Sequence, residues 1–175
     1  MGLELAASGG QLLGIMRQIV LALCIALAPL AAVAADWGRY VNERFGVAVD
    51  VPPGFAAGEP PANGDGLSFA TPTARLAVFG SLLFARDFEA EVRQRIEWAE
   101  AEGWAITYQA STPSWASWSG QRGSRILYAR AEPICGGDAI GAFEFTYSSA
   151  DRAAFDPVVN RLVRSLGDSG QGWQC

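Results

Sequence analysis

A run of alternating residues at positions 45–51 constrains the fold of this chain more than any other feature. Every second residue of the run is apolar, from Phe45 to Val51, with glycine, alanine or aspartate between. A period of two is that of a half-buried strand. Pro52 and Pro53 follow, and because neither can donate a backbone hydrogen to a sheet, the strand ends there. The remaining chain must therefore supply the core that covers its apolar face.

The first 35 residues have the features of a secretory signal peptide. Arg17 precedes an apolar run over 19–35, and Ala32-Val33-Ala34 supplies small residues at the spacing of a cleavage site. The run is short for a membrane span and contains Pro29. We therefore expect a single domain over 36–175, without a membrane span, in the periplasm or outside the cell.

The sequence also predicts where this leader starts and ends. Met16 lies directly before the positive charge and is expected to be the true start, so that residues 1–15 precede the natural chain. Cleavage is expected after Ala34 or Ala35. Cys24 is not expected to carry a lipid, because Leu23 before it is too large for a lipid-attachment site.

The composition excludes several classes of function. The chain of 175 residues has no histidine, its 13 basic residues are all arginine, and its net charge is −5. Nucleophiles activated by histidine, Schiff-base chemistry and the lysine of a phosphate-binding loop are therefore excluded. An acidic chain without a basic cluster also does not attract nucleic acid or an anionic membrane. We expect a protein without catalytic activity and without a cofactor.

Two helices are predicted from capping residues and apolar stripes. Asp87 is a suitable N-cap for a helix over 87–102, and Gly103 is a suitable C′ residue directly after it. Its acidic residues, including Glu91 in a pair with Arg95, indicate a solvated face. A second helix is expected after a short turn over 149–154. It begins anew at Asp156, with Pro157 in the first helical position, and its apolar stripe extends to Leu166.

The remaining chain predicts strands. Alternation or apolar runs bounded by turn residues indicate strands over 67–70, 75–83, 104–109, 115–119, 123–132 and 139–147. The hairpin turn between the fourth and fifth of these is expected at Gly120-Gln121-Arg122, and Gly80 marks a place where another group packs closely. This order predicts the α+β class: an antiparallel sheet of about six to seven strands with two helices packed on it.

The loop Asn63-Gly64-Asp65-Gly66 has two interpretations. Asn-Gly and Asp-Gly both favour the left-handed backbone of a tight turn, which is the simpler explanation. Alternatively, Asn63 and Asp65, with Glu59, supply oxygen ligands to calcium. The segment lacks the alternating acidic positions and terminal glutamate of a full calcium loop, so the turn is favoured.

Two further patterns suggest ligand sites. Trp115 and Trp118 lie in one short strand beside serines, and aromatic faces stack on sugar rings, which would suit a carbohydrate or envelope glycan. However, residues three apart point to opposite faces of a strand, which favours tryptophans that fill the core. A hydrolase that uses only carboxylates is the other possibility, drawing on Asp50, Glu59, Asp65 and Glu144, but nothing in the sequence brings any two of them together.

Two cysteines remain after removal of the leader, Cys135 and Cys175. An even number of cysteines in an exported chain predicts a disulfide, since the periplasm keeps thiols oxidised. Cys135 lies in a glycine-rich loop and Cys175 ends a flexible tail long enough to reach it, which favours a bond within the chain. Pairing between two chains is the alternative.

The order of elements and several motifs resemble a known family. Tyr40-x-Asn42-x-Arg44-Phe45-Gly46 before a valine strand that ends in proline is similar to the start of PsbP-like domains. The segment 103–108 and the end of the last helix at Ser165-Leu166 resemble small secreted bacterial members, similar to the periplasmic DcrB-like proteins. This resemblance implies an α/β/α sandwich. It also implies a binding or assembly module whose partner, an envelope protein or a small ligand, is unknown.

Overall fold

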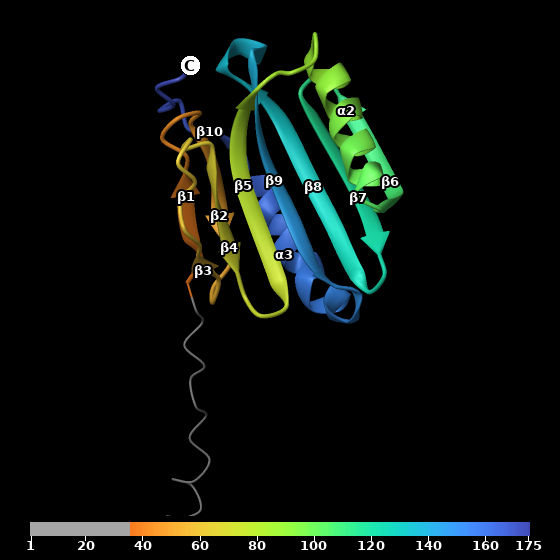
Figure 1. Ribbon diagram of the computed structural model, residues 1–175. Coiled ribbons are helices and arrows are strands. Elements are labelled where there is room, and N and C mark those ends of the chain that lie inside the picture. The colour runs from red at the N-terminus through yellow and green to blue at the C-terminus, as the bar shows by residue number, and fades with distance from the viewer. Residues whose placement is uncertain (1–35) are drawn as a thin grey trace, which may run out of the picture. The chain divides into compact units, whose positions relative to one another are not determined.

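The structure, a computed structural model, describes residues 36–175, so the predicted signal peptide, Met16 and Cys24 lie outside the described residues. Two antiparallel sheets and two long helices make up the described residues (Figure 1). No helix among them is long and apolar enough to cross a membrane. The strands are β1 (Gly38–Val41), β2 (Val47–Val51), β3 (Ala56–Ala57), β4 (Gly66–Ala70), β5 (Ala74–Leu82), β6 (Ala105–Thr112), β7 (Trp115–Arg122), β8 (Arg125–Ile134), β9 (Ala139–Ser148) and β10 (Gly167–Asp168).

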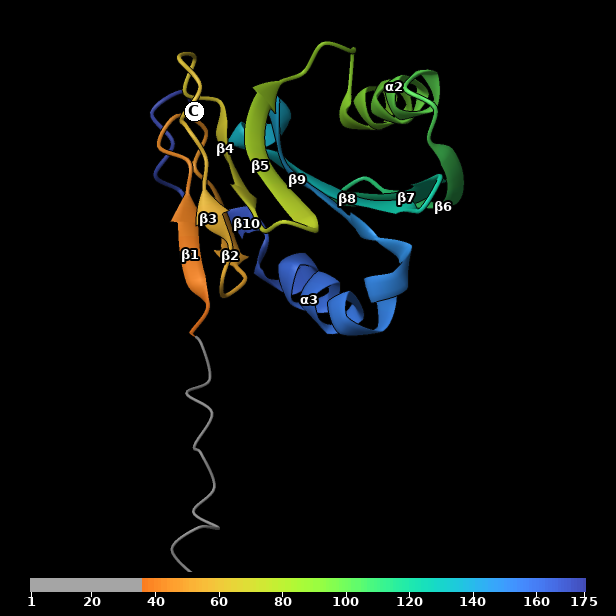
Figure 2. The ribbon, with the colours of Figure 1, turned by 60° about the horizontal axis from the view of Figure 1, so that its bottom comes forward.

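The helices lie on opposite faces of the larger sheet. This sheet has seven strands in the order β3-β4-β5-β9-β8-β7-β6, and the smaller one has the order β1-β2-β10. Helix α2 (Phe88–Ala101) packs on one face, and helix α3 (Arg152–Ser165) lies on the other together with the small sheet (Figure 2). Short 3₁₀ turns cover Cys135–Gly137 and Ser149–Asp151. The predicted α+β class is confirmed.

The larger core lies between the big sheet, α3 and β2. Phe143 and Phe145 of β9 and Leu162 of α3 are fully buried in it. The alternation of β9 and the three-and-four spacing of α3 bring these apolar side chains onto facing surfaces. The apolar stripe predicted for the last helix therefore forms this core, which also contains Val47, Val49, Val51, Phe69, Leu76, Val78, Ile126, Tyr147, Val159 and Leu166.

Two glycines allow β2 and the loop before it to lie directly on the big sheet. Gly80 and Gly141 are paired across β5 and β9. A Cβ atom on Gly80 would lie 2.2 Å from the Cβ atom of Phe45, and one on Gly141 would lie 2.7 Å from a methyl group of Val47. The close approach predicted at Gly80 is therefore confirmed, and Phe45 is the group that packs there.

Several predicted boundaries are wrong. The strand predicted over 45–51 begins at Val47 and not at Phe45, which lies in the turn before it. The β7–β8 turn is at Gly123-Ser124 rather than at 120–122, because Gly123 takes the left-handed backbone (φ 58°) that a two-residue turn requires. Helix α3 is also continuous from Arg152, so Pro157 lies inside it and not at its first position. Pro157 has no N–H group, so the helical hydrogen bond to the carbonyl of Ala153 is absent. This is tolerated near the helix start, because Ala153 is exposed and its carbonyl can bind water.

Glu91 is buried and not on a solvated face. Its side chain is fully inaccessible, and one carboxylate oxygen accepts hydrogen bonds from the backbone N–H groups of Phe84 (2.8 Å) and Ala85 (3.1 Å). The other oxygen accepts a bond from Arg95 Nε at 2.9 Å. Position 91 lies one turn from Phe88 and therefore borders the apolar stripe. The bonds from Phe84 and Ala85 to Glu91 attach the β5–α2 loop to the helix.

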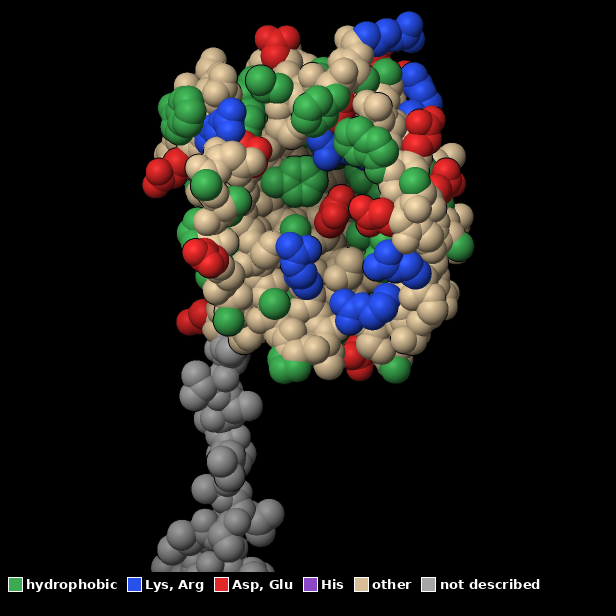
Figure 3. All heavy atoms as spheres, in the orientation of Figure 1, with side chains coloured by type: hydrophobic (Ala, Val, Ile, Leu, Met, Phe, Trp, Pro, Cys, Tyr) green, Lys and Arg blue, Asp and Glu red, His purple; other side chains and the backbone are tan. Residues whose placement is uncertain are grey.

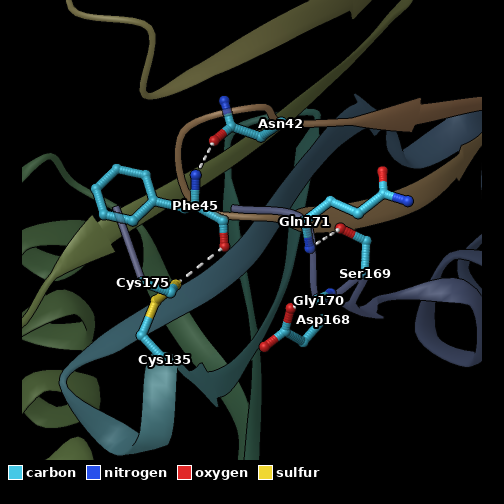
Figure 4. The surroundings of a disulfide bond; sticks show 8 residues. All are labelled: Asn42, Phe45, Cys135, Asp168, Ser169, Gly170, Gln171 and Cys175. Atoms are coloured by element: carbon cyan, nitrogen blue, oxygen red, sulfur yellow. Dashed lines mark hydrogen bonds between the residues drawn. A yellow bond between two sulfur atoms is a disulfide. The ribbon is translucent and has the colours of Figure 1, made fainter. Parts of the chain in front are cut away.

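The C-terminal tail is attached to the loop between β1 and β2. Backbone N–H groups of Ser169, Trp173 and Gln174 donate to carbonyls of that loop at 2.8–3.2 Å. Cys175 is bonded to Cys135, with their Cα atoms 4.8 Å apart, and its sulfur lies 3.6 Å from the carbonyl oxygen of Phe45 (Figure 4). The predicted disulfide within the chain is confirmed, and it closes the tail over the buried ring of Phe45.

We predict that reduction of this disulfide destabilises the domain. The bond joins residues 40 apart, for which loop-closure entropy suggests a loss of about 4 kcal/mol in the free energy of unfolding. Urea unfolding with and without reductant measures the loss. A double variant, Cys135→Ser with Cys175→Ser, is the control and should not respond to reductant. Equal stability of the oxidised and reduced wild-type protein would contradict the prediction.

Candidate functional site

Helix α2 covers only part of its face of the big sheet. The row beneath it, paired across four strands, consists of the half-buried Phe79 and three buried alanines, Ala142, Ala131 and Ala116. The next row along the strands lies near the C-terminal end of α2. It contains Ala77, Glu144, Ala129 and Trp118. The row after that contains Arg75, Thr146, Leu127 and Gly120. Polar residues therefore enter the sheet where the cover by the helix stops.

A hollow of about 330 Å³ occupies this uncovered part of the sheet. Figure 3 shows arginine side chains gathered around acidic ones on the face that carries α2. The end of α2 and residues 102–104 after it form one wall, and strands β5, β9, β8 and β7 form the floor. The lining residues are Arg75, Arg95, Trp98, Ala99, Glu102, Trp104, Arg122, Arg125, Leu127, Glu144 and Thr146.

Glu144 lies on the floor between two alanines. Its partners across the sheet are Ala77 and Ala129, which are too small to contact its carboxylate or to fill the space around it. Burial raises the pKa of the Glu144 carboxyl above its ordinary value, and the charge of Glu102 raises it further, while Arg95 and Arg75 oppose the rise. Within residues 36–175 its side chain has neither a hydrogen bond nor an ion pair, so it remains available to a ligand.

Three arginines of the hollow are held by neutral oxygens. Arg75 donates to Ser68 Oγ at 2.6 Å and Arg122 to the backbone carbonyl of Glu102 at 2.7 Å. Arg125 donates to the carbonyl of Thr73 at 2.9 Å and to the Thr146 hydroxyl at 3.2 Å. None of the three forms an ion pair within the described residues. Each guanidinium has five N–H groups, so donors remain free in all three.

Two tryptophans border the hollow on the side of α2. Trp104 is buried, and the guanidinium of Arg122 lies 4.5 Å from the centre of its ring. Trp98 is 45% exposed and contacts the ring of Phe84 edge-on, with 6.2 Å between ring centres. The hollow thus offers cations, one acceptor without a partner and apolar ring surface within one small volume.

The turn at Asn63 and Asp65 is tied to Arg44. Arg44 forms an ion pair with Asp65 and donates to the backbone carbonyl of Asn63 at 2.9 Å. The second oxygen of Asp65 accepts a bond from the Asn63 amide at 2.5 Å. Both oxygens of the calcium candidate Asp65 are therefore engaged within the protein. In the part of the chain described, no three acidic or cysteine residues are grouped as metal ligands would be.

The two tryptophans considered for a glycan do not form a platform. Trp118 is 2% exposed beneath α2, and Trp115 is on the opposite face of β7, with the guanidinium of Arg130 4.3 Å from its ring centre. A buried ring cannot stack on a sugar. The tryptophans that border the hollow beside α2 are different residues, Trp98 and Trp104.

Of the four carboxylates considered for hydrolysis, two line one hollow and the other two lie elsewhere. Asp50 on β2 pairs with Arg39 (3.1 Å) and Arg161 (2.9 Å). Glu59 and Asp65 border a second hollow beside β4, of about 420 Å³, where Asp65 is already paired. Glu144 alone lines the hollow beside α2, and its carboxylate neighbour there is Glu102, which was not among the four.

Sequence reasoning missed the arginines of the hollow. Arg75, Arg122 and Arg125 are far apart in the chain and are scattered singly among strand residues. No local pattern singles them out, because Arg122 and Arg125 share the phase of their strands with apolar residues such as Trp118 and Leu127. Their convergence depends on pairing β5 with β9, β9 with β8 and β8 with β7, which the sequence pattern did not provide.

Comparison with known proteins shows a fold and no family by sequence. No protein-family model and no curated protein matches the chain. The solution structure of PsbP from the cyanobacterium Synechocystis sp. PCC 6803 (CyanoP) aligns with a TM-score of 0.60 at 11% identity, over 82% of this chain and 99% of that one. The Ran-binding protein Mog1p of Saccharomyces cerevisiae aligns with a TM-score of 0.57 at 9% identity, over 77% and 96%. The fold is PsbP-like, as the sequence predicted, while the likeness to DcrB-like proteins stays a prediction.

We predict that Glu144 makes the stability of the domain depend on pH. Because its pKa is raised in the folded protein, the carboxyl favours folding below its ordinary pKa of 4.5, and this contribution is lost as the pH rises through the folded value. Urea unfolding should therefore show Glu144→Gln gaining stability relative to wild type between acid and neutral pH. Glu97→Gln, an exposed change on α2, should show no such trend. A constant difference between Glu144→Gln and wild type at every pH would refute the prediction.

Proposed function

We propose that this chain is an exported binding module, without catalytic activity, that holds its ligand in the hollow beside α2. One observation carries the proposal: three arginines without acidic partners and a glutamate without a hydrogen bond converge on one uncovered part of a sheet. Clefts that bind small molecules combine apolar walls with a few convergent polar groups. The volume of the hollow is at the lower end of the range of such clefts.

Export rests on the leader and on the disulfide. A chain that keeps Cys135 and Cys175 bonded is suited to an oxidising compartment. The apolar leader over 19–35, with its cleavage site, directs a chain to such a compartment. Both features support a periplasmic location, and we propose that the mature chain begins at Ala35 or Asp36.

A binding role agrees with the structural neighbours. Mog1p is named as a Ran-binding protein, and PsbP of Synechocystis is a neighbour of the same fold. The fold by itself supports many functions, so the hollow and not the likeness carries the argument.

Hydrolysis by carboxylates is the second candidate, because Glu144 and Glu102 line one hollow and the pKa of Glu144 is raised. Glycoside hydrolysis passes through a transition state with positive charge on the sugar. Three arginines without acidic partners beside these carboxylates would destabilise that charge. A negatively charged ligand that is bound and released unchanged suits the same groups better.

A thermal-shift measurement tests the binding role. A ligand present at ten times its Kd stabilises a protein by roughly 1.4 kcal/mol, which for a domain of this size raises Tm by about 4 °C. We expect a low-molecular-mass filtrate of periplasm to raise Tm of the purified chain. We expect no rise for a variant with Arg75→Ala and Arg125→Ala.

The matched control is Arg152→Ala with Arg164→Ala, which removes two exposed arginines of α3 and should leave the rise intact. Absence of a rise for wild type, or an equal rise for both double variants, would overturn the proposed site. The mass of the chain recovered from the periplasm checks export: a chain that retains Cys24 would contradict it.

A further inference from the structure

The charges of the hollow are arranged in order along the strands. Glu144 is in the row at the end of the helix, Arg75 is in the next row on the same face of β5, and Arg125 and Arg122 are paired with each other beside the β7–β8 turn. A ligand in this hollow therefore meets an acceptor at its inner end and guanidinium donors at its outer end. The ligand has to present the opposite groups in the same order.

The free donors favour a carboxylate at the outer end. A guanidinium binds a carboxylate through two parallel hydrogen bonds, which makes this contact strong and directional. Arg75, Arg122 and Arg125 are held in place by bonds to neutral oxygens and keep donors for a ligand. Their charges are not neutralised by acidic side chains among residues 36–175.

Glu144 distinguishes between kinds of anion. A phosphate or another polyanion would place negative charge against the Glu144 carboxylate, which is repulsive. A plain carboxylic acid would leave Glu144 further desolvated and still without a donor, which is costly for a buried polar group. An amino or hydroxyl group close to the carboxylate avoids both problems, since it donates to Glu144.

The walls of the hollow add an apolar contact. Trp98 and Trp104 present ring surface beside Leu127 of the floor. An apolar side chain on the ligand would cover these rings and gain the usual stabilisation from removing apolar surface from water.

Resting on the proposed binding role, we propose that the hollow binds a small organic acid whose carboxylate lies next to an amino or hydroxyl group and which carries an apolar side chain. The arginines Arg75, Arg122 and Arg125 hold the carboxylate, Glu144 accepts from the amino or hydroxyl group, and Trp98 and Trp104 contact the apolar part. Apolar amino acids and their hydroxy-acid counterparts have this chemistry.

Nuclear magnetic resonance of the indole N–H groups tests the proposal with four probes. L-phenylalanine and 3-phenyllactate have both groups, 3-phenylpropionate lacks the donor, and phenethylamine lacks the carboxylate. The six tryptophans give one indole signal each. We expect phenylalanine or phenyllactate to shift the signals of Trp98 and Trp104 and to leave those of Trp37 and Trp173 unchanged, because the latter two lie outside the hollow.

Loss of either group should weaken binding by about tenfold or more, as expected for a hydrogen bond to a charged partner. In Glu144→Gln, the preference for phenylalanine over 3-phenylpropionate should shrink, because the carboxylate that attracts the ammonium is gone. Arg75→Ala with Arg125→Ala should abolish binding of both acids. Arg152→Ala should bind like wild type.

Three results would overturn the proposal: no shift with phenylalanine or phenyllactate, equal affinity of wild type for 3-phenylpropionate, or an unchanged preference in Glu144→Gln. If an arginine variant fails to fold, the comparison of probes on the wild-type protein still decides. A rise of Tm with periplasmic filtrate but no response to any probe would reject this ligand class and leave the binding role in place. Absence of both responses would reject the two together.

Discussion

The length of helix α2 determines how much of its face of the sheet is covered and how much is left open. A helix of 14 residues is about 21 Å long, whereas the ten-residue strands β8 and β9 extend about 33 Å. A helix of this length cannot cover such strands from end to end. Apolar residues of β7, β8 and β9, most of them alanines, lie beneath it, and polar residues lie beyond its C-terminal end. The hollow is therefore a consequence of two element lengths.

The opposite face shows how complete cover is achieved. Helix α3 also has 14 residues, but β2 lies beside it, and Phe45 and Val47 contact the glycines of β5 and β9 directly. The disulfide and the tail then close this end of the core. This face has a continuous apolar core, and the arginines and Glu144 of the hollow lie on the other face. The larger core and the proposed binding site thus lie on opposite faces of one sheet.

Sequence alone predicted much of this fold and little of the site. Alternation in β9, the cap at Asp87 and the count of two cysteines depend on neighbours in the chain or on composition, and they were predicted correctly. Glu91 was misjudged because a glutamate on a helix is ordinarily solvated, and only the loop beside it provides the two N–H groups that its carboxylate accepts from. Arg75, Arg122 and Arg125 converge only through strand order, which local patterns do not contain.

The central proposal is that a ligand occupies the hollow in the compartment where the protein functions. Modification of carboxylates by a water-soluble carbodiimide, read residue by residue with mass spectrometry, tests this in intact periplasm without knowledge of the ligand. We expect Glu144 and Glu102 to react several times more slowly there than in dialysed, purified protein, while Glu97 and Glu59 react equally in both. Equal reactivity of Glu144 in the two preparations would contradict the claim.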